Sequence, residues 1–151
     1  MPVADLASNY GLARELWLDP AAVPPDRIHR LESDAADLDA AAARAELDLV
    51  RCLGRPPRLD VVLLGVGADG HVCSLFPGHA LLDEEQKWIG VETAAPAPPP
   101  RRLTLRLPAL AAAELIVVAA FGDTKAGVVH AALRDPLRGA RARECRTSWC
   151  P

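Results

Sequence analysis

Residues 59–77 read LDVVLLGVGADGHVCSLFP, and this stretch decides the fold. Its apolar run, residues 61–64, is rich in β-branched and leucyl side chains and ends at glycine, which is typical of a strand buried on both faces of a parallel sheet. The polar residues that follow then lie at the carboxyl end of a strand, where open α/β sheets bind ligands. We expect Gly67 and Gly70 to bring backbone N–H groups close to a ligand oxygen, with His71 presented on the same turn.

Apolar patterns elsewhere predict the remaining elements of an α/β domain. The expected strands, besides a short edge strand at Ile28, are residues 88–92, 103–107 and 115–121, and the last of these again has the pattern of a strand buried on both faces. The expected helices are residues 8–17, 33–53, 110–114 and 123–133. These elements fit a Rossmann-like fold, a mostly parallel sheet flanked by helices, in a single domain over residues 1–151.

Polar residues mark the expected starts of two helices. Ser8 is the expected N-cap of the first helix, and Asp123 or Thr124 that of the last. Lys125 then lies in the first turn of the last helix. Because Lys125 follows one apolar strand as His71 follows another, we expect both side chains at the same edge of the sheet.

Composition and charge limit the classes of partner. Of 151 residues, 50% are hydrophobic and 25% charged, as in an ordinary globular domain, and Trp17, Trp88 and Trp149 are the expected large packing anchors. The formal net charge of −3 provides no broad positive field, so neither nucleic acid nor a membrane surface is an expected partner. No apolar run approaches the roughly 20 residues that cross a bilayer, and the first residues lack a signal-peptide pattern. The expected compartment is the cytoplasm.

The spacing of metal-ligand residue types does not predict a metal site. The cysteines are Cys52, Cys73, Cys145 and Cys150. They show neither C-x-x-C spacing nor the density of a disulfide scaffold, so we expect reduced thiols that pack as small hydrophobes. His29, beside an arginine, is expected to be a solvated surface histidine. Neither a metal nor a cofactor is expected.

Residues 65–77 resemble the signature of the 6-phosphogluconolactonases, within the superfamily that also contains the glucosamine-6-phosphate deaminases. Residues 8–10 (SNY), 99–105 (PPRRLTL) and 122–126 (GDTKA) support the resemblance by their order and spacing. It extends roughly over residues 1–136 and implies the family's fold. Compared with the family pattern, we expect this chain to be truncated at both ends and to lack the family's N-terminal strands and phosphate-binding loop.

The resemblance implies hydrolysis of 6-phospho-D-glucono-1,5-lactone to 6-phospho-D-gluconate in the oxidative pentose phosphate pathway. His71 would be the base that activates water, and Arg102 and Lys125 would bind the 6-phosphate. The chemistry agrees, since an unperturbed imidazole has a pKa near 6.5 and guanidinium and ammonium groups bind phosphate strongly. Asp69 would orient His71 or accept hydrogen bonds from substrate hydroxyls. Backbone N–H groups around Gly67 suit the developing oxyanion.

Two alternatives stay open at this point. One is a non-catalytic or inactive sugar-phosphate-binding remnant, whose open strand edges would invite pairing with a second chain, so a homodimer is a possible assembly. The other is a glucosamine-6-phosphate deaminase-type isomerase. In that branch the corresponding loop ends in Asn-Glu-Pro and supplies a carboxylate, whereas residues 74–77 read SLFP here. The missing glutamate argues against deamination.

Overall fold

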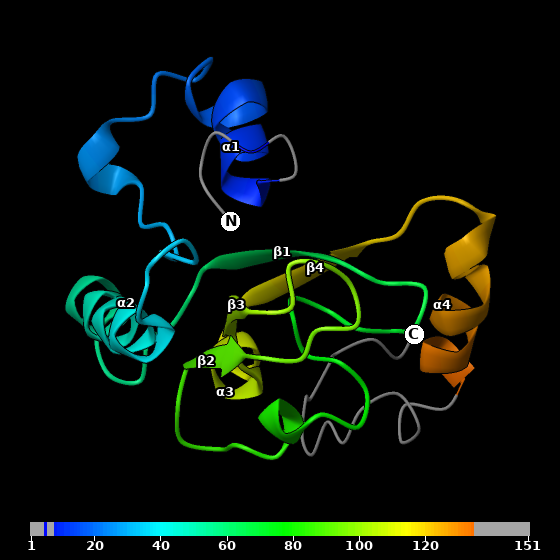
Figure 1. Cartoon of the computed structure of the whole chain (residues 1–151). Coiled ribbons are helices and arrows are strands. Elements are labelled where there is room, and N and C mark those ends of the chain that lie inside the picture. Colours follow the sequence, from blue (N-terminus) through cyan, green and yellow to red (C-terminus); the bar gives the residue numbers. More distant parts are fainter. Residues whose placement is uncertain (1–4, 6–7, 135–151) are drawn as a thin grey trace.

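Two neighbouring parallel strands lie at the centre of the fold. In this computed structural model, which describes residue 5 and residues 8–134, strand β1 is Val61–Gly65 and strand β4 is Leu115–Ala119. Gly65 lies opposite Ala119, so both strands end at the same edge of the sheet. Figure 1 shows the two strands side by side across the middle of the molecule. The predicted α/β class is confirmed.

The second sheet is an antiparallel pair. Strand β2, Ile89–Glu92, pairs with strand β3, Arg102–Leu105, so the strands predicted over residues 88–92 and 103–107 are confirmed with small shifts of their ends. Within the described residues, one pair is thus parallel and one antiparallel, whereas the sequence predicted a mostly parallel sheet. The short loop between β2 and β3 contains no crossover helix, and such a connection permits only antiparallel pairing.

Neither central strand is buried on both faces. In β1, Val62 and Leu64 are buried and pack with Leu75 and Leu110, whereas Leu63 is 71% exposed. Most of β4 is exposed as well. The prediction that both strands are buried on both faces is wrong, because a continuous apolar run shows that two faces can be buried but does not show what covers each of them.

Helix α2, Leu38–Leu53, covers the antiparallel pair. Its residues Leu38 and Ala41 form a buried cluster with Leu103 of β3. The helix begins five residues later than predicted, because Asp37 has an extended backbone and caps the first turn. Its carboxylate accepts a hydrogen bond from the Ala40 N–H at 3.0 Å.

We expect Asp37→Ala to lower the free energy of unfolding by about 0.5–2 kcal/mol, because the first turn of α2 then loses its side-chain acceptor. Asp37→Asn keeps an amide oxygen at the cap and should stay close to the wild type. Urea unfolding followed by circular dichroism measures both variants. An equal loss in the two variants would show that the charge of Asp37, and not its cap, is what stabilises the helix.

The N-terminal segment contains helix α1, Asn9–Ala13, which continues as a π-helical turn, Arg14–Leu18. Ser8 Oγ accepts a hydrogen bond from the Gly11 N–H at 3.1 Å, so the predicted helix and its cap are confirmed. Trp17 was an expected packing anchor, but it is 62% exposed because it lies on the outer face of this turn.

Ile28 belongs to none of the strands that the structure describes, so the predicted edge strand is wrong. The chain there forms a 3₁₀ turn, Pro25–Arg27, that ends at Ile28. The reason is that Pro25 fixes a φ value suited to the start of a helical turn and offers no N–H for a strand partner.

The remaining helices follow β3 and β4. Helix α3, Leu107–Ala111, starts three residues earlier than predicted, with a proline in its first turn. A 3₁₀ turn, Asp123–Lys125, precedes helix α4, Ala126–Arg134. Gly122, at φ 84°, is the N-cap of this turn, so the predicted side-chain cap by Asp123 or Thr124 is wrong.

The structure describes no helix with both the length and the apolar character needed to span a membrane. The predicted anchor Trp149 and two of the cysteines, Cys145 and Cys150, lie outside the described residues.

Candidate active site

The loop after β1 is a tight turn closed by its own backbone. The Gly67 N–H donates to the His71 carbonyl at 2.8 Å, and the Gly70 N–H donates to the Gly67 carbonyl at 3.0 Å. Gly70 has a φ of 90°, a conformation that glycine adopts without strain. Both N–H groups are therefore used inside the turn in this structure, and their contact with a substrate oxyanion stays a prediction.

His71 and Asp69 form a close pair on this turn. The Asp69 carboxylate accepts from His71 Nδ1 at 2.6 Å and from the His71 backbone N–H at 3.2 Å. Because a carboxylate can only accept, Nδ1 carries the hydrogen and the lone pair of the neutral imidazole lies on Nε2. Partial burial acts to raise the pKa of Asp69, but the hydrogen bonds from His71 lower it below its ordinary value. The pair therefore consists of an ionised carboxylate and an oriented imidazole.

Gly67 lies directly beneath this pair. A Cβ atom at this position would overlap Nδ1 and Cε1 of the His71 ring and approach Asp69 Oδ1 to 2.5 Å. The sequence predicted a role for the N–H of Gly67. The structure adds a steric role, because only a residue without a side chain leaves room for the paired imidazole and carboxylate.

Phe76 contacts both the histidine and a cation. Its ring, which is almost fully buried, lies 4.5 Å from the His71 ring, and its centroid lies 5.7 Å from Cζ of Arg102. The histidine from the β1 loop and the arginine from β3 therefore contact the same aromatic ring. Sequence reasoning did not single out Phe76. The available signal was its rarity, since the chain has two phenylalanines.

The Arg102 guanidinium is held by the loop that precedes β3. Nε donates to the Pro99 carbonyl at 2.9 Å, and Nη2 donates to the Ala97 carbonyl at 2.7 Å. A guanidinium has five N–H donors in a fixed fork, so these contacts orient it without using its full capacity for an anion. The neighbouring arginine, Arg101, is exposed.

Lys125 lies at the same sheet edge as the histidine turn. It is half-buried in the 3₁₀ turn that follows β4, and β4 ends beside the end of β1. Figure 1 shows the segments that follow the two strands on the same side of the sheet. The topology thus places Lys125 as the sequence predicted, while a direct role in binding phosphate stays a prediction.

The comparison with protein families agrees with this arrangement. The chain matches the model described as "Glucosamine-6-phosphate isomerases/6-phosphogluconolactonase" over residues 1–149. It belongs to this family. In open α/β sheets, ligands bind beyond the carboxyl ends of the strands, which is where His71 and Lys125 lie here.

Known members of the glucosamine-6-phosphate isomerase/6-phosphogluconolactonase family are clearly similar to the chain. A 6-phosphogluconolactonase from Rattus norvegicus is 38% identical over 136 residues, which cover 89% of this chain and 53% of the rat protein. The crystal structure of a 6-phosphogluconolactonase from Leishmania guyanensis is 29% identical and has a TM-score of 0.76, covering 93% of this chain and 65% of that one. One from Trypanosoma cruzi also has a TM-score of 0.76, at 27% identity, covering 89% and 57%. The chain thus spans about half the length of the curated relatives that it matches.

In this family member, the residues after the histidine are tied to β3. The Ser74 N–H donates to Thr104 Oγ1 at 3.0 Å, and both residues are buried. Burial raises the pKa of the neighbouring Cys73 thiol, which keeps it protonated at neutral pH. A buried hydroxyl and a neutral thiol are poor nucleophiles, so neither side chain is suited to attack a substrate.

Glu92 contacts the site indirectly, through His79. Its carboxylate, 5% exposed, accepts from His79 Nδ1 at 2.9 Å and from the Ala94 N–H at 2.7 Å. The His79 ring lies 5.3 Å from the ring of Phe76. Phe76 therefore contacts both His79 and the predicted base, His71.

We expect Glu92→Gln to lower the free energy of unfolding by about 1–3 kcal/mol at pH 7, because a buried charged acceptor is lost from two donors. Burial acts to raise the pKa of Glu92, but the hydrogen bonds from Ala94 and His79 outweigh it and hold the pKa below the ordinary 4.5. A lowered folded-state pKa stabilises the fold above pH 4.5, and this contribution disappears as the pH falls through the folded-state value.

The difference in the free energy of unfolding between wild type and Glu92→Gln should therefore become smaller as the pH is lowered from 7 to below 4. Urea unfolding at several pH values measures it. Glu85→Gln, which changes an exposed acid just before the same strand, is the matched control and should change stability little at any of these pH values. A difference in the free energy of unfolding that stays constant with pH for Glu92→Gln would contradict the role assigned to the carboxylate.

Proposed function

We propose that the chain hydrolyses 6-phospho-D-glucono-1,5-lactone to 6-phospho-D-gluconate, a step of the oxidative pentose phosphate pathway. The observation that carries this proposal is the 2.6 Å pair of His71 Nδ1 and Asp69 at the carboxyl end of β1, which leaves Nε2 as a base. The names of the rat and trypanosomatid relatives support it.

In the proposed reaction, His71 Nε2 removes a proton from a water molecule as the water oxygen attacks the lactone carbonyl carbon. The tetrahedral intermediate then collapses, the bond from that carbon to the ring oxygen breaks, and the imidazolium returns the proton to the departing oxygen. Asp69 stabilises the imidazolium between the two steps. Such a positioned base contributes about 10²–10⁴-fold to the rate.

Arg102 and Lys125 supply the positive charge for the 6-phosphate. Arg102 is already oriented by two backbone carbonyls and by Phe76, so little side-chain freedom is lost when an anion binds. A phosphate held at this edge of the sheet would position the lactone carbonyl against the histidine. This arrangement needs no metal or cofactor in the reaction.

The loop after His71 disfavours the deaminase alternative. Leu75, which lies within residues 74–77 where the deaminase branch carries its glutamate, is 3% exposed and packs in the core with Val62 and Leu64. An apolar core side chain cannot supply a carboxylate for ring opening. The lactonase branch of the family is therefore the better match to this site.

The test follows acid release from freshly prepared 6-phosphogluconolactone, compared with spontaneous hydrolysis in the same buffer. We expect the chain to accelerate release, with kcat/KM for the phosphorylated lactone at least about tenfold above that for gluconolactone without phosphate, since a charge-assisted contact contributes about 1.5–3 kcal/mol. A rate equal to the spontaneous one would contradict catalysis by this chain. Calorimetric binding of 6-phosphogluconate would then support the non-catalytic binding alternative.

The assembly and the compartment stay predictions. The exposed apolar side chains of β1 and β4, with Leu63 at 71% and Val118 at 54%, support the possible homodimer. Light scattering in solution gives the mass that tests it. The cytoplasm remains the predicted compartment, on the sequence grounds given above.

A further inference from the structure

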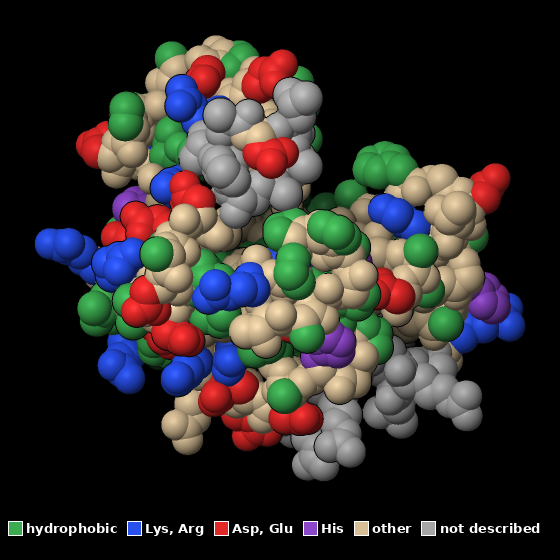
Figure 2. Space-filling model, viewed as in Figure 1, with side chains coloured by type: hydrophobic (Ala, Val, Ile, Leu, Met, Phe, Trp, Pro, Cys, Tyr) green, Lys and Arg blue, Asp and Glu red, His purple; other side chains and the backbone are tan. Residues whose placement is uncertain are grey.

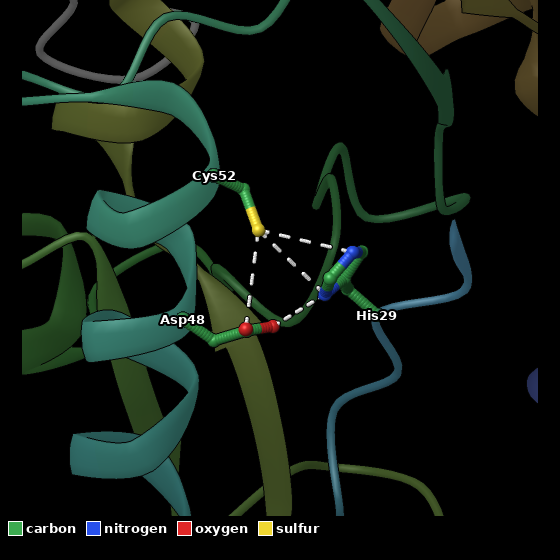
Figure 3. A group of neighbouring side chains, drawn as sticks. All are labelled: His29, Asp48 and Cys52. Atoms are coloured by element: carbon green, nitrogen blue, oxygen red, sulfur yellow. Dashed lines mark hydrogen bonds and ion pairs between the residues drawn. The ribbon is translucent and has the colours of Figure 1, made fainter. Parts of the chain in front are cut away.

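A second cluster of reactive side chains lies outside the proposed lactone site. Figure 3 shows His29, Asp48 and Cys52 pointing toward one another. His29 Nδ1 lies 2.6 Å from Asp48 Oδ2, and Cys52 Sγ lies 3.9 Å from Asp48 Oδ1 and 3.8 Å from His29 Nε2. The candidate ligand atoms all lie within 4.8 Å of one another.

The fold brings these residues together from two segments. Asp48 and Cys52 are one turn apart on α2 and therefore share a helix face. His29 comes from the extended segment that follows the 3₁₀ turn Pro25–Arg27. The cluster lies on the helix that leads into β1, whereas the histidine turn follows the opposite, carboxyl end of that strand (Figure 1).

The structure corrects one sequence expectation here and adds to another. Cys52 was expected to pack as a small hydrophobe, but it is exposed, because it lies on a face of α2 away from the core. His29 is exposed, as expected of a surface histidine, and its ring is also paired with Asp48. Short spacings between metal-ligand residue types did not reveal the cluster, because His29 lies 19 residues before Asp48 in the sequence.

Neighbouring cations do not fill the cluster. Arg30 is paired with Asp34 at 2.8 Å, and Arg44 is paired with Glu32 at 2.6 Å. Of the two cations adjacent to the cluster in sequence, Arg30 is thus already paired, and Arg51 is exposed. A metal that displaces the Cys52 proton would give the cluster a thiolate beside the Asp48 carboxylate, two negative charges that match a divalent cation.

We propose that His29, Asp48 and Cys52 bind a divalent transition metal of the Zn²⁺ type, with water completing a four-coordinate site. Thiolate and imidazole ligands favour Zn²⁺ over Mg²⁺ and Ca²⁺. Zinc bonds of about 2.3 Å to sulfur and about 2.0–2.1 Å to nitrogen separate two tetrahedral ligands by roughly 3.6 Å. The sulfur already lies close to this distance from both partners. The metal would lie between His29 Nδ1 and Asp48, the single hydrogen of the neutral imidazole would then be on Nε2, and the thiol proton of Cys52 would pass to solvent.

The same geometry disfavours a Cys-His-Asp nucleophile. Cys52 Sγ is almost equally far from both ring nitrogens of His29, at 3.9 Å from Nδ1 and 3.8 Å from Nε2. The sulfur therefore lies along the lone pair of neither nitrogen, and it is beyond the hydrogen-bond reach that activates a nucleophile. Because the His29 side chain is exposed, its ring can turn to direct a nitrogen at a metal, and ligation would then link the His29 segment to α2.

The test uses the full chain with Cys145→Ser and Cys150→Ser, so that cysteines near the C-terminus cannot contribute thiolates. Co²⁺ is titrated as a spectroscopic probe and then displaced by Zn²⁺. We expect one equivalent of Co²⁺ to bind with a thiolate-to-cobalt charge-transfer absorption band. Cys52→Ser should abolish the band, and His29→Ala should weaken Co²⁺ binding at least about tenfold, since loss of even an outer-shell partner costs 10–100-fold.

Asp39→Asn is the matched control, because it removes an exposed acid from the same helix outside the cluster, and it should leave Co²⁺ binding within about twofold. Far-ultraviolet circular dichroism verifies that each variant is folded, as expected for changes at exposed side chains. A chain that shows no charge-transfer band would overturn the proposal. A band that persists in Cys52→Ser, or one that Asp39→Asn removes equally, would also overturn it.

Discussion

Replacement of His71 by asparagine is expected to lower kcat for hydrolysis of 6-phosphogluconolactone by about 10²–10⁴-fold, the contribution of a positioned general base. Asparagine can still accept a contact on this turn, but it cannot take a proton from water. The Asp69 carboxylate would then lack the cation that it stabilises in the proposed reaction. Steady-state acid release, corrected for spontaneous hydrolysis, measures the effect.

The matched control is His130→Asn, which removes an exposed imidazole from helix α4 and should leave kcat unchanged within about twofold. KM should change much less than kcat in His71→Asn, because the predicted phosphate ligands, Arg102 and Lys125, are untouched. If His71→Asn keeps more than a tenth of the wild-type kcat, the base lies elsewhere, and the 2.6 Å pair with Asp69 has another purpose.

The position of His71 could be predicted because it depends on local sequence. An apolar run that ends in glycine fixes both a strand and its carboxyl end, and the residues just beyond that end reach the ligand-binding edge in any parallel arrangement. The same reasoning placed Lys125 after β4, where the structure has it. The positions of His71 and Lys125 could be predicted from the direction of one strand each, and that direction follows from the order of residues in the sequence.

The environment of these residues could not be predicted, because it depends on contacts between distant segments. Phe76 stacks with His71 from its own loop, but its contact with Arg102 requires the loop to fold against β3. The cluster of His29 and Cys52 likewise requires an extended segment to return to α2. The prediction that β1 is buried on both faces was wrong for the same reason, since Leu63 is apolar yet exposed. A side chain's polarity does not show which surface will cover it.

Figure 2 shows that hydrophobic and charged side chains are interspersed over the visible face. This agrees with the small formal net charge of −3. Under the proposed function, an anionic sugar phosphate would be bound by a few oriented groups such as Arg102, and not by a broad field. The backbone carbonyls that orient Arg102 would then contribute to affinity.

The second large effect is expected from Gly67→Ala, the smallest change that fills the space beneath the pair of His71 and Asp69. Its Cβ would overlap the His71 ring and approach Asp69 Oδ1 to 2.5 Å, so the imidazole must move or the pair must separate. A displacement of about 1 Å at a reacting group can cost 10²-fold in rate, and we expect kcat to fall by about this factor. Acid release measures kcat, and urea unfolding measures whether the fold is retained.

Gly65→Ala is the control that separates this steric effect from the general cost of altering the loop. Gly65 ends the same strand two residues earlier, and a Cβ there meets no atom within 4 Å, so activity should stay within about twofold of the wild type. The two variants add the same methyl group to the same segment, and only one of them adds it under the imidazole. Equal activities would mean that the ring of His71 need not lie over Gly67 during catalysis, and the geometry that carries the lactonase proposal would then be irrelevant to the rate.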